Sequence, residues 1–181
     1  MRLSERMEQL LNELLHYSRI SRKKITFKNV NMVELVSDIK DTLKPILEEK
    51  GIDLQIAHDM PSIECEKILI NELFTNLIVN STKYNDKEHK WIKVGCDTVD
   101  GKENVFYVSD NGIGIKEKHL DAVFKIFKRI HSRDKYGGGT GFGLTIAKKI
   151  VEQHQGEIWL ESEYGKGTTF YFTLTSGAQS E

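Results

Sequence analysis

Apolar residues recur at helical spacing over the first part of the chain. Between residues 2 and 21 the spacing alternates between four and three, and two further leucines widen the stripe: Leu3, Met7, Leu10, Leu14 and Tyr17, with Leu11 and Leu15. This pattern predicts an amphipathic helix. The stripe is too short to form a coiled coil alone, so we expect it to pack in a helical bundle. Packing on the core of its own domain is the alternative.

The rest of the chain alternates between strand and helix spacing. The pattern predicts, in order, a strand (24–32), a helix ending at Gly51 (32–51), a strand (52–59), a long helix (64–84), a hairpin turning at Asp100-Gly101 (91–99 and 103–110), a short helix and connection (116–130), a helix (142–154) and a final strand pair joined at Gly165-Lys166-Gly167 (156–175). This order predicts an α/β fold, a two-layer sandwich of a mixed β-sheet covered on one face by helices.

The composition fits one globular domain with a little extra chain. The protein has 181 residues, of which 39% are hydrophobic, and a net charge of −1, so a basic surface for nucleic acid is not indicated. Cys65 and Cys96 form no C-x-x-C pair, which argues against a disulfide framework or a zinc site and fits a reducing cytoplasm. No apolar run approaches about 20 residues and no signal-peptide core is present, so we expect a soluble, cytoplasmic chain.

A glycine-rich segment, GGGTGFGL at residues 137–144, runs directly into a predicted helix. Glycine lets a ligand approach the backbone closely, and a helix start offers free N–H donors, so the segment predicts a phosphate site. Two common phosphate loops do not fit. Leu144 stands where the P-loop needs its lysine, and no glycine falls at the last position of a G-x-G-x-x-G pattern. A flexible linker is the alternative.

Two amides and a lysine share one face of the long predicted helix. Asn76 and Asn80 are four residues apart, and Lys83 follows three residues later. An amide oxygen suits Mg²⁺, which takes only one or two protein ligands when it is bound to nucleotide phosphates, and a nearby lysine would neutralise phosphate charge. A solvated polar face is the alternative interpretation.

The segment SDNGIGI, residues 109–115, follows a predicted strand. Asp110 would project a carboxylate from the strand end, and a carboxylate that only accepts hydrogen bonds can bind an exocyclic amine such as that of adenine. Gly112 and Gly114 would let the chain turn closely around a flat ring. Taken alone, Asp-Asn-Gly is also an ordinary tight-turn sequence.

Together and in this order, over about residues 25–175, these features resemble the ATP-binding catalytic domain of sensor histidine kinases, within the GHKL ATPase superfamily. The matching motifs are NLIVNSTKY (N box), DNGIGI (G1 box), VFKIF (F box, with Phe124 and Phe127), GTGFGL (G2 box) and GKGTTF, the last glycine motif. The first helix, which ends LLHYSRI, resembles the second helix of the dimerisation and histidine-phosphotransfer hairpin. The implied division is a partial hairpin at 1–22 and an ATP-binding domain at 23–181.

The resemblance implies ATP and Mg²⁺ as ligands. Asn80 would hold Mg²⁺, Asn76 and Lys83 would lie near the phosphates, and Tyr84 would line the nucleotide. Asp110 would bind the adenine amine, with these residues beside the base or supporting it: Gly112, Gly114 and Thr168. The phosphates would be cradled at the helix start by Gly139, Thr140, Gly141, Phe142, Gly143 and Leu144.

Residues 128–140 would form a mobile ATP lid, from which Arg129, Arg133 or Lys135 would reach the γ-phosphate. Asn80, Lys83 and Arg129 are the residues expected to act in catalysis. The segment has more glycine ahead of GTGFGL than many relatives have, so the lid hinge is expected to be looser and the alignment is open by a residue or two.

Transfer is favoured over hydrolysis. Gyrase-type relatives place a glutamate four residues before the magnesium asparagine, and here that position is Asn76, which cannot take a proton from water. Glu72 lies a further turn back. Phosphoryl transfer mainly requires positioning and charge neutralisation, and this site has groups for both.

No histidine in the chain fits the family's acceptor pattern, in which an acidic residue follows directly and a proline comes a turn later. His16 lies on the first helix and is expected to be a polar surface residue. We therefore expect the acceptor to lie upstream or on a partner. The implied partners are that phosphoacceptor hairpin, a response-regulator receiver domain, and a second copy in the full-length protein. A non-catalytic ATP-binding regulator or scaffold of the same fold is the alternative function.

Overall fold

The computed structural model describes residues 3–22, 25–125 and 141–175. Its elements are α1 (Leu3–Arg22), β1 (Lys28–Asn31), α2 (Met32–Lys50), β2 (Ile52–Ile56), β3 (Ser62–Cys65), α3 (Lys67–Lys83), β4 (Lys90–Val99), β5 (Lys102–Asp110), the 3-10 helix η1 (Glu117–Ala122), α5 (Gly143–Gln153), β6 (Ile158–Glu163) and β7 (Gly167–Phe172). The predicted order of helices and strands is confirmed except for β3, which the sequence pattern missed.

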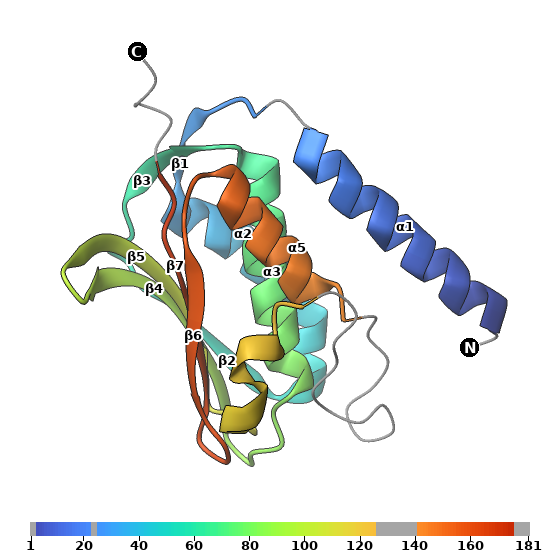
Figure 1. The fold of residues 1–181 in the computed structure, drawn as a ribbon. Coiled ribbons are helices and arrows are strands. Elements are labelled where there is room, and N and C mark those ends of the chain that lie inside the picture. Colours follow the sequence, from blue (N-terminus) through green and yellow to red (C-terminus); the bar gives the residue numbers. More distant parts are fainter. Residues whose placement is uncertain (1–2, 23–24, 126–140, 176–181) are drawn as a thin grey trace.

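The main sheet has five strands in the order β2-β4-β5-β7-β6, and only β2 and β4 run parallel. Helices α2, α3 and α5 cover one face of this sheet, and α1 lies outside the helical layer beside α5 (Figure 1). The predicted two-layer α/β sandwich with a mixed sheet is therefore confirmed. A separate two-stranded sheet pairs β1 with β3.

The sequence pattern missed strand β3 because this strand is only four residues long. The sequence pattern predicted one helix over 64–84, but α3 begins at Lys67, and Glu64 and Cys65 belong to β3. A four-residue strand shows too few alternations to be distinguished from the first turn of an apolar helix. Its pairing with β1, in which Cys65 faces Lys28, depends on residues far away in the sequence.

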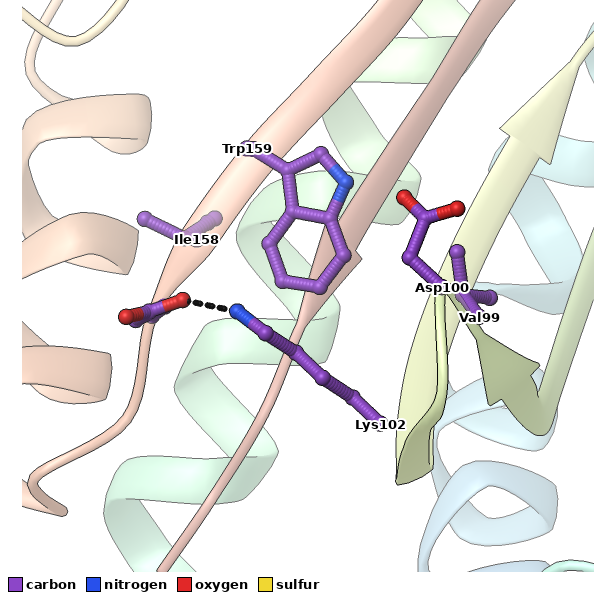
Figure 2. A pocket seen from close by; sticks show the side chains of 6 residues that line it. Val99, Asp100, Lys102, Ile158 and Trp159 are labelled. Carbon is purple, nitrogen blue, oxygen red and sulfur yellow. Dashed lines mark hydrogen bonds and ion pairs between the residues drawn. The ribbon is translucent and has the colours of Figure 1, made fainter.

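The β4–β5 hairpin turns at Asp100 and Gly101, which both have positive φ angles (51° and 77°), as the Asp-Gly turn predicted. A hollow of about 440 Å³ lies beside this turn, between the hairpin and the start of β6. In it, Lys102 forms an ion pair with Glu157, and its Nζ lies 5.3 Å from the centre of the Trp159 ring (Figure 2). The charged groups of this hollow thus largely satisfy one another.

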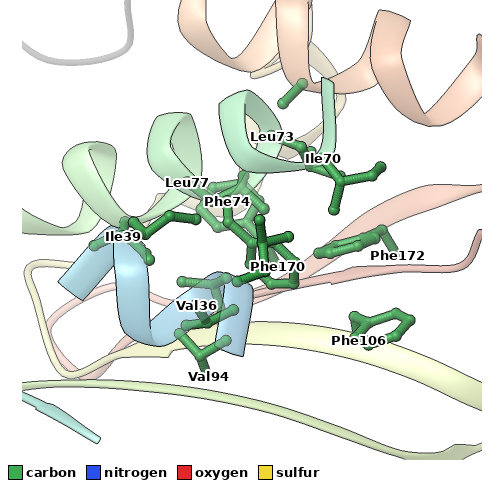
Figure 3. Close-up of a cluster of buried hydrophobic side chains, with 14 of the residues drawn as sticks. Val36, Ile39, Ile70, Leu73, Phe74, Leu77, Val94, Phe106, Phe170 and Phe172 are labelled. Atoms are coloured by element: carbon green, nitrogen blue, oxygen red, sulfur yellow. The ribbon is translucent and has the colours of Figure 1, made fainter. Parts of the chain in front are cut away.

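The core lies between the helices and the sheet. Alternation along β5 and β7 points Phe106, Phe170 and Phe172 toward the helices, where Phe74 of α3 packs edge-on against Phe106 and Phe172, with ring centres 6.2 and 5.3 Å apart (Figure 3). These rings are fully buried. They hold α3 over β5 and β7, the two strands whose ends carry Asp110 and Thr168.

Helix α1 is packed at one end only. Ile20 is 2% exposed and Tyr17 packs against the core, whereas the apolar residues nearer the N-terminus are exposed, namely Met7, Leu11, Leu14 and Leu15. The last turns of the helix pack on the core of the domain, which was the alternative to packing in a bundle. Packing of the remaining apolar stripe in a bundle stays a prediction.

Among the described helices, none is both long and apolar enough to cross a membrane. Cys65 and Cys96 are both free thiols, and burial raises the pKa of each to about 11.

Candidate functional site

A buried carboxylate closes one end of the sheet. Asp110 is the last residue of β5, where it lies between Ile92 of β4 and Thr168 of β7. Its side chain points under α3, and the residue is only 8% exposed. Ser81 Oγ donates to Asp110 Oδ2 at 2.7 Å, and the Gly112 N–H donates to Oδ1 at 2.9 Å.

The pKa of Asp110 is set by two opposing effects. Burial raises it above its ordinary value, and the hydrogen bonds from Ser81 and from the backbone N–H groups of Gly112 and Thr168 lower it, with burial the larger effect. A buried carboxylate with fixed orientation accepts hydrogen bonds without offering any. It can therefore select a ligand that presents an amine.

Three glycines bring separate segments into contact around Asp110. A Cβ on Gly112 would lie 2.3 Å from the Tyr84 carbonyl oxygen, and one on Gly167 would lie 2.0 Å from that of Asp110. Gly114 has a φ of +65°, and its Cβ would meet the Glu163 carbonyl at 2.1 Å. In this structure the space at Gly112 and Gly114 is taken by neighbouring backbone, so their place beside a base stays a prediction.

Thr168 lies next to Asp110 and is 7% exposed. Its Oγ1 lies 2.8 Å from Ser162 Oγ, which donates to the Gly167 carbonyl and accepts from the Ile115 N–H, both at 2.8 Å. This network ties the β6–β7 turn to the loop after Asp110 and holds Thr168 beside Asp110, while its role at the adenine end stays a prediction.

Asn111 holds the loop that follows Asp110 against the start of β4 and the segment before it. Its Oδ1 accepts from the Trp91 N–H at 3.0 Å and from Asn85 Nδ2 at 2.9 Å, and its Nδ2 donates to the His89 carbonyl at 2.7 Å. Sequence reasoning missed both Asn111 and Ser81. Asn111 was visible only as part of a turn motif, and Ser81 only as the neighbour of Asn80.

The amide stripe of α3 meets the start of α5. Asn76, Asn80 and Lys83 are all partly buried, and a Cβ on Gly143 would lie 3.4 Å from Asn76 Oδ1. Asn76 Nδ2 is buried and, within the described ranges, lacks a hydrogen-bond partner. A buried unsatisfied donor costs about 1–3 kcal/mol, so this amide requires an acceptor beyond those that the described residues supply. A phosphate oxygen would satisfy it.

The structure places four of the predicted phosphate-loop residues at the beginning of α5. Gly141 has a φ of +85°, Phe142 is 1% exposed, and Gly143 and Leu144 form the first turn of the helix. The first turn of α5 lies beside the amide stripe, and the N–H groups of a helix's first turn have no partner within the helix itself. Phe124 packs against Phe170, while these predicted residues lie outside the described ranges: Phe127, Arg129, Arg133, Lys135, Gly139 and Thr140.

Residues of α3 connect the two halves of the site. Ser81, which holds Asp110, directly follows Asn80, and Tyr84 at the end of α3 accepts the Ile113 N–H at 2.9 Å. The predicted adenine residue Asp110 is thus tied to the same helix that carries the predicted phosphate residues Asn76 and Lys83. The hollow in Figure 2 is at the opposite end of β5 and takes no part in this arrangement.

The amide stripe fits the ligand chemistry of magnesium. Among the residues that the structure describes, no group of three or more His, Cys, Asp or Glu side chains could hold a metal. A cation here would be held by amide oxygen and by ligand phosphates, which is how Mg²⁺ is commonly bound with nucleotides. Asn80, the predicted magnesium ligand, supplies such an amide on the stripe that meets the start of α5.

Glu72 lies one turn before Asn76 on α3, and its Oε1 is 2.6 Å from Nε2 of His16 on α1. Sequence analysis expected His16 to be only a surface residue. Its side chain is indeed 43% exposed, but it makes this specific contact. The Glu72 carboxylate is therefore occupied by α1.

Comparison with known proteins agrees with this geometry. Residues 65–177 match the family described as histidine kinase-, DNA gyrase B- and HSP90-like ATPase. Cyanobacterial phytochrome B of Nostoc sp. strain PCC 7120 is 53% identical over 173 residues, which make up 96% of this chain and 23% of that protein. The sensor histidine kinase WalK of Bacillus subtilis is 34% identical over 187 residues, which cover 98% of this chain and 30% of that protein.

Among solved structures, full-length ShkA in complex with AMPPNP matches with a TM-score of 0.78 at 22% identity, and the match covers 94% of this chain and 36% of that one. This likeness shows that the fold is shared. The chain spans less than a third of the length of either curated relative.

Proposed function

Because this chain belongs to the family of histidine kinase-, DNA gyrase B- and HSP90-like ATPases, we propose that it is the ATP-binding catalytic portion of a sensor histidine kinase. It binds Mg-ATP and transfers the γ-phosphate to a histidine outside this chain. Residues 1–22 are part of the dimerisation and phosphotransfer hairpin, and residues 23–181 form the ATP-binding domain.

The observation that carries the proposal is the continuity of the site along α3. Ser81, which holds the buried acceptor Asp110, directly follows Asn80 on the helix. Asn76, one turn before Asn80, presents a buried donor that no described residue satisfies. An amine-selecting group and a phosphate-binding group on one helix match the two ends of adenosine triphosphate.

Each residue then has a stated task. Asp110 accepts from the adenine amino group, with Thr168, Gly112 and Gly114 around the base. Asn76 and Lys83 bind phosphate oxygens, and Tyr84 lines the nucleotide. The start of α5 surrounds the phosphates with the residues Gly139, Thr140, Gly141, Phe142, Gly143 and Leu144, and Arg129 reaches the γ-phosphate. Asn80 holds Mg²⁺, which when bound neutralises charge on the phosphates.

Transfer is favoured because no carboxylate is available to activate water at the expected position. Asn76 is an amide and cannot act as a base. Glu72 is the next acidic residue along the helix, and its Oε1 is engaged by His16 at 2.6 Å. A kinase benefits from this arrangement, since hydrolysed ATP is lost for transfer.

The partners follow from the same proposal. The exposed apolar stripe of α1, which includes Met7, Leu11 and Leu14, fits a homodimeric helical bundle in the full-length protein. That bundle carries the acceptor histidine, which passes the phosphate to a response-regulator receiver domain. The ATP-binding portion works in the cytoplasm.

Mixing this chain with radiolabelled ATP, Mg²⁺ and a separate phosphoacceptor hairpin tests the proposal. We expect an acid-labile phosphohistidine on the hairpin, and none with Asp110→Asn, because the amide would present a donor to the adenine amine. ATP binding without phosphohistidine would instead support a non-catalytic ATP-binding regulator. Undiminished ATP affinity of Asp110→Asn by calorimetry would overturn the adenine assignment.

A further inference from the structure

The first helix touches the nucleotide-binding helix through one polar contact. His16 Nε2 and Glu72 Oε1 are 2.6 Å apart, and the two residues are separated by 56 positions in the sequence. The side chains are 43% and 27% exposed, so the contact is at the rim of the helical layer. None of the roles proposed for the ATP site uses His16.

The same stretch of α1 makes two further contacts with the body of the protein. Ile20 is buried in the core, and Lys149 Nζ of α5 lies 5.9 Å from the centre of the Tyr17 ring. Beyond His16, toward the N-terminus, Leu15 and Leu14 are 54% and 46% exposed. The described contacts of these residues with the core and with α3 and α5 are thus made by the last turns of α1, from His16 to Ile20.

Two separated contacts fix a direction that one contact cannot. Ile20 anchors α1 at a point, about which the helix could still swing. His16 lies four residues away, about 6 Å along the helix axis at 1.5 Å per residue, and it binds a different element from the one that Tyr17 meets. The pair His16 and Glu72 thus adds a contact with a second element, α3, that limits the angle of α1 to the ATP-binding unit.

Glu72 also places this contact close to the proposed phosphate site. Residues four apart lie on one side of a helix, so Glu72, Asn76 and Asn80 form a single stripe on α3. Each step along this stripe is about 6 Å. The contact between His16 and Glu72, which we call the clasp, is thus next to the amides proposed to bind phosphate. Glu72 itself is not one of the residues assigned to phosphate.

We propose that His16 and Glu72 are positioning residues that hold α1 at one angle to the nucleotide-binding unit and so orient that unit toward the helical bundle. This inference rests on the proposed function for its purpose, but the geometry of the clasp can be tested without it. A single partly exposed polar contact contributes little to the stability of the fold, so the clasp can open and close without unfolding the chain.

Spin labels on two exposed residues, Glu8→Cys of α1 and Lys44→Cys of α2, would measure the angle in a Cys96→Ser background, since Cys65 is buried. We expect one narrow distance distribution for this parent. His16→Ala or Glu72→Ala should widen it at least twofold. The exchanged pair, His16→Glu with Glu72→His, should restore the narrow distribution, which a loss of packing alone would not allow.

A matched control removes an ion pair elsewhere. Glu163→Ala breaks the contact with Lys166, which has a 2.8 Å separation, and should leave the distribution unchanged. A narrow distribution in both single variants, or no recovery in the exchanged pair, would overturn the proposal. ATP affinity is measured in the same samples and should stay within about twofold of the parent. A parent that does not bind ATP would refute the proposed function while the distances still report on the clasp.

Discussion

Ser81 Oγ donates a 2.7 Å hydrogen bond to Asp110 Oδ2, and this bond joins the helix of the amide stripe to the buried end of β5. The two residues are 29 positions apart, and both are buried. The bond orients the carboxylate under α3. Its Oδ1 is held independently by the Gly112 N–H.

Ser81→Ala is expected to weaken binding of ATP and ADP by about tenfold, or about 1.4 kcal/mol, because hydrogen bonds to charged groups contribute about 1.5–3 kcal/mol. Isothermal titration calorimetry measures the change. Ser109→Ala is the control, since Ser109 is next to Asp110 but bonds to Thr169 on the opposite face of the sheet. Equal affinities for the two variants would show that the Ser81 bond does not support binding.

Asp110→Asn should change the pH dependence of the free energy of unfolding and, as a separate effect, abolish ATP binding. The folded-state pKa of Asp110 is raised, mainly by burial. Between the unfolded value and this raised value the native state binds more protons, so the residue's contribution to stability falls as pH rises through that window. At a pH above the raised pKa the carboxylate is charged, and the whole free-energy cost of burying that charge opposes folding. The asparagine variant lacks this effect.

We therefore expect the stability of the parent, relative to Asp110→Asn, to be greater near pH 4 than at pH 7. Urea unfolding of both proteins at the two pH values gives this difference. A relative stability that does not change with pH, or that changes in the opposite direction, would contradict the raised pKa. Loss of ATP binding is expected in the variant at both pH values.

Much of this site could be predicted from short motifs, and the rest depends on packing. Asn76 and Asn80 were found from helical spacing, and Asp110 from its place at a strand end. The bond from Ser81 to Asp110 could not be found in this way, because it requires α3 to lie over β5. The place of Thr168 beside Asp110 needs the register of β5 with β7. Both depend on long-range pairing that local patterns do not encode.

The first helix shows the same limit. Its apolar spacing predicted an amphipathic helix, and the helix is present. Spacing alone could not tell which turn docks on the domain, since the stripe is continuous through Leu10, Leu14 and Tyr17. In the structure His16 meets Glu72 of another element, a pairing that spacing along the first helix does not encode.

His154 should make the fold sensitive to acid. The ring is fully buried, its Nδ1–H donates to the Ile150 carbonyl at 2.8 Å, and its Nε2 accepts from the Glu66 N–H at 3.2 Å. A carbonyl only accepts and an amide N–H only donates, so these partners define the neutral tautomer. Burial lowers the pKa of His154. Its contribution to stability is therefore complete above the unfolded value of about 6.5 and is lost as pH falls toward the folded value.

The expected result is a lower urea midpoint at pH 5.5 than at pH 7.5, by an amount corresponding to about 1 kcal/mol. His154→Gln should reduce this pH dependence even if it lowers stability at both values. His58→Gln, at an exposed position, is the control and should keep the parent's dependence. An unchanged dependence in His154→Gln would assign the acid sensitivity to another group.

Gly112→Ala is expected to destabilise the protein by more than about 2 kcal/mol and to abolish ATP binding. The new methyl group would lie 2.3 Å from the Tyr84 carbonyl and 2.8 Å from Asp110 Oδ1, so backbone must move. Gly101→Ala is a control for backbone strain alone, because Gly101 has a positive φ and nothing within 4 Å of the added atom. It should cost about 1 kcal/mol and leave ATP affinity intact. Wild-type binding by Gly112→Ala would show that this contact is not needed for the site.

Asn76→Ala should raise stability or leave it unchanged while it weakens binding of Mg-ATP. The Asn76 amide nitrogen is buried, and no described residue accepts from it, so without ligand it costs about 1–3 kcal/mol, which the alanine variant avoids. In the proposed function the same amide donates to a phosphate when ligand is bound, so its removal should lower affinity at least tenfold. Thermal unfolding and calorimetry on the same samples measure both effects.

The matched control for this contrast is Asn85→Ala. Both ends of the Asn85 amide are satisfied, since Nδ2 donates to Asn111 Oδ1 at 2.9 Å and Oδ1 accepts from the Lys87 N–H at 3.1 Å. Its removal should lower stability by about 1 kcal/mol. An Asn76→Ala variant that behaves in the same way, losing stability without ligand, would mean that the Asn76 amide serves the fold and is not directed at a phosphate.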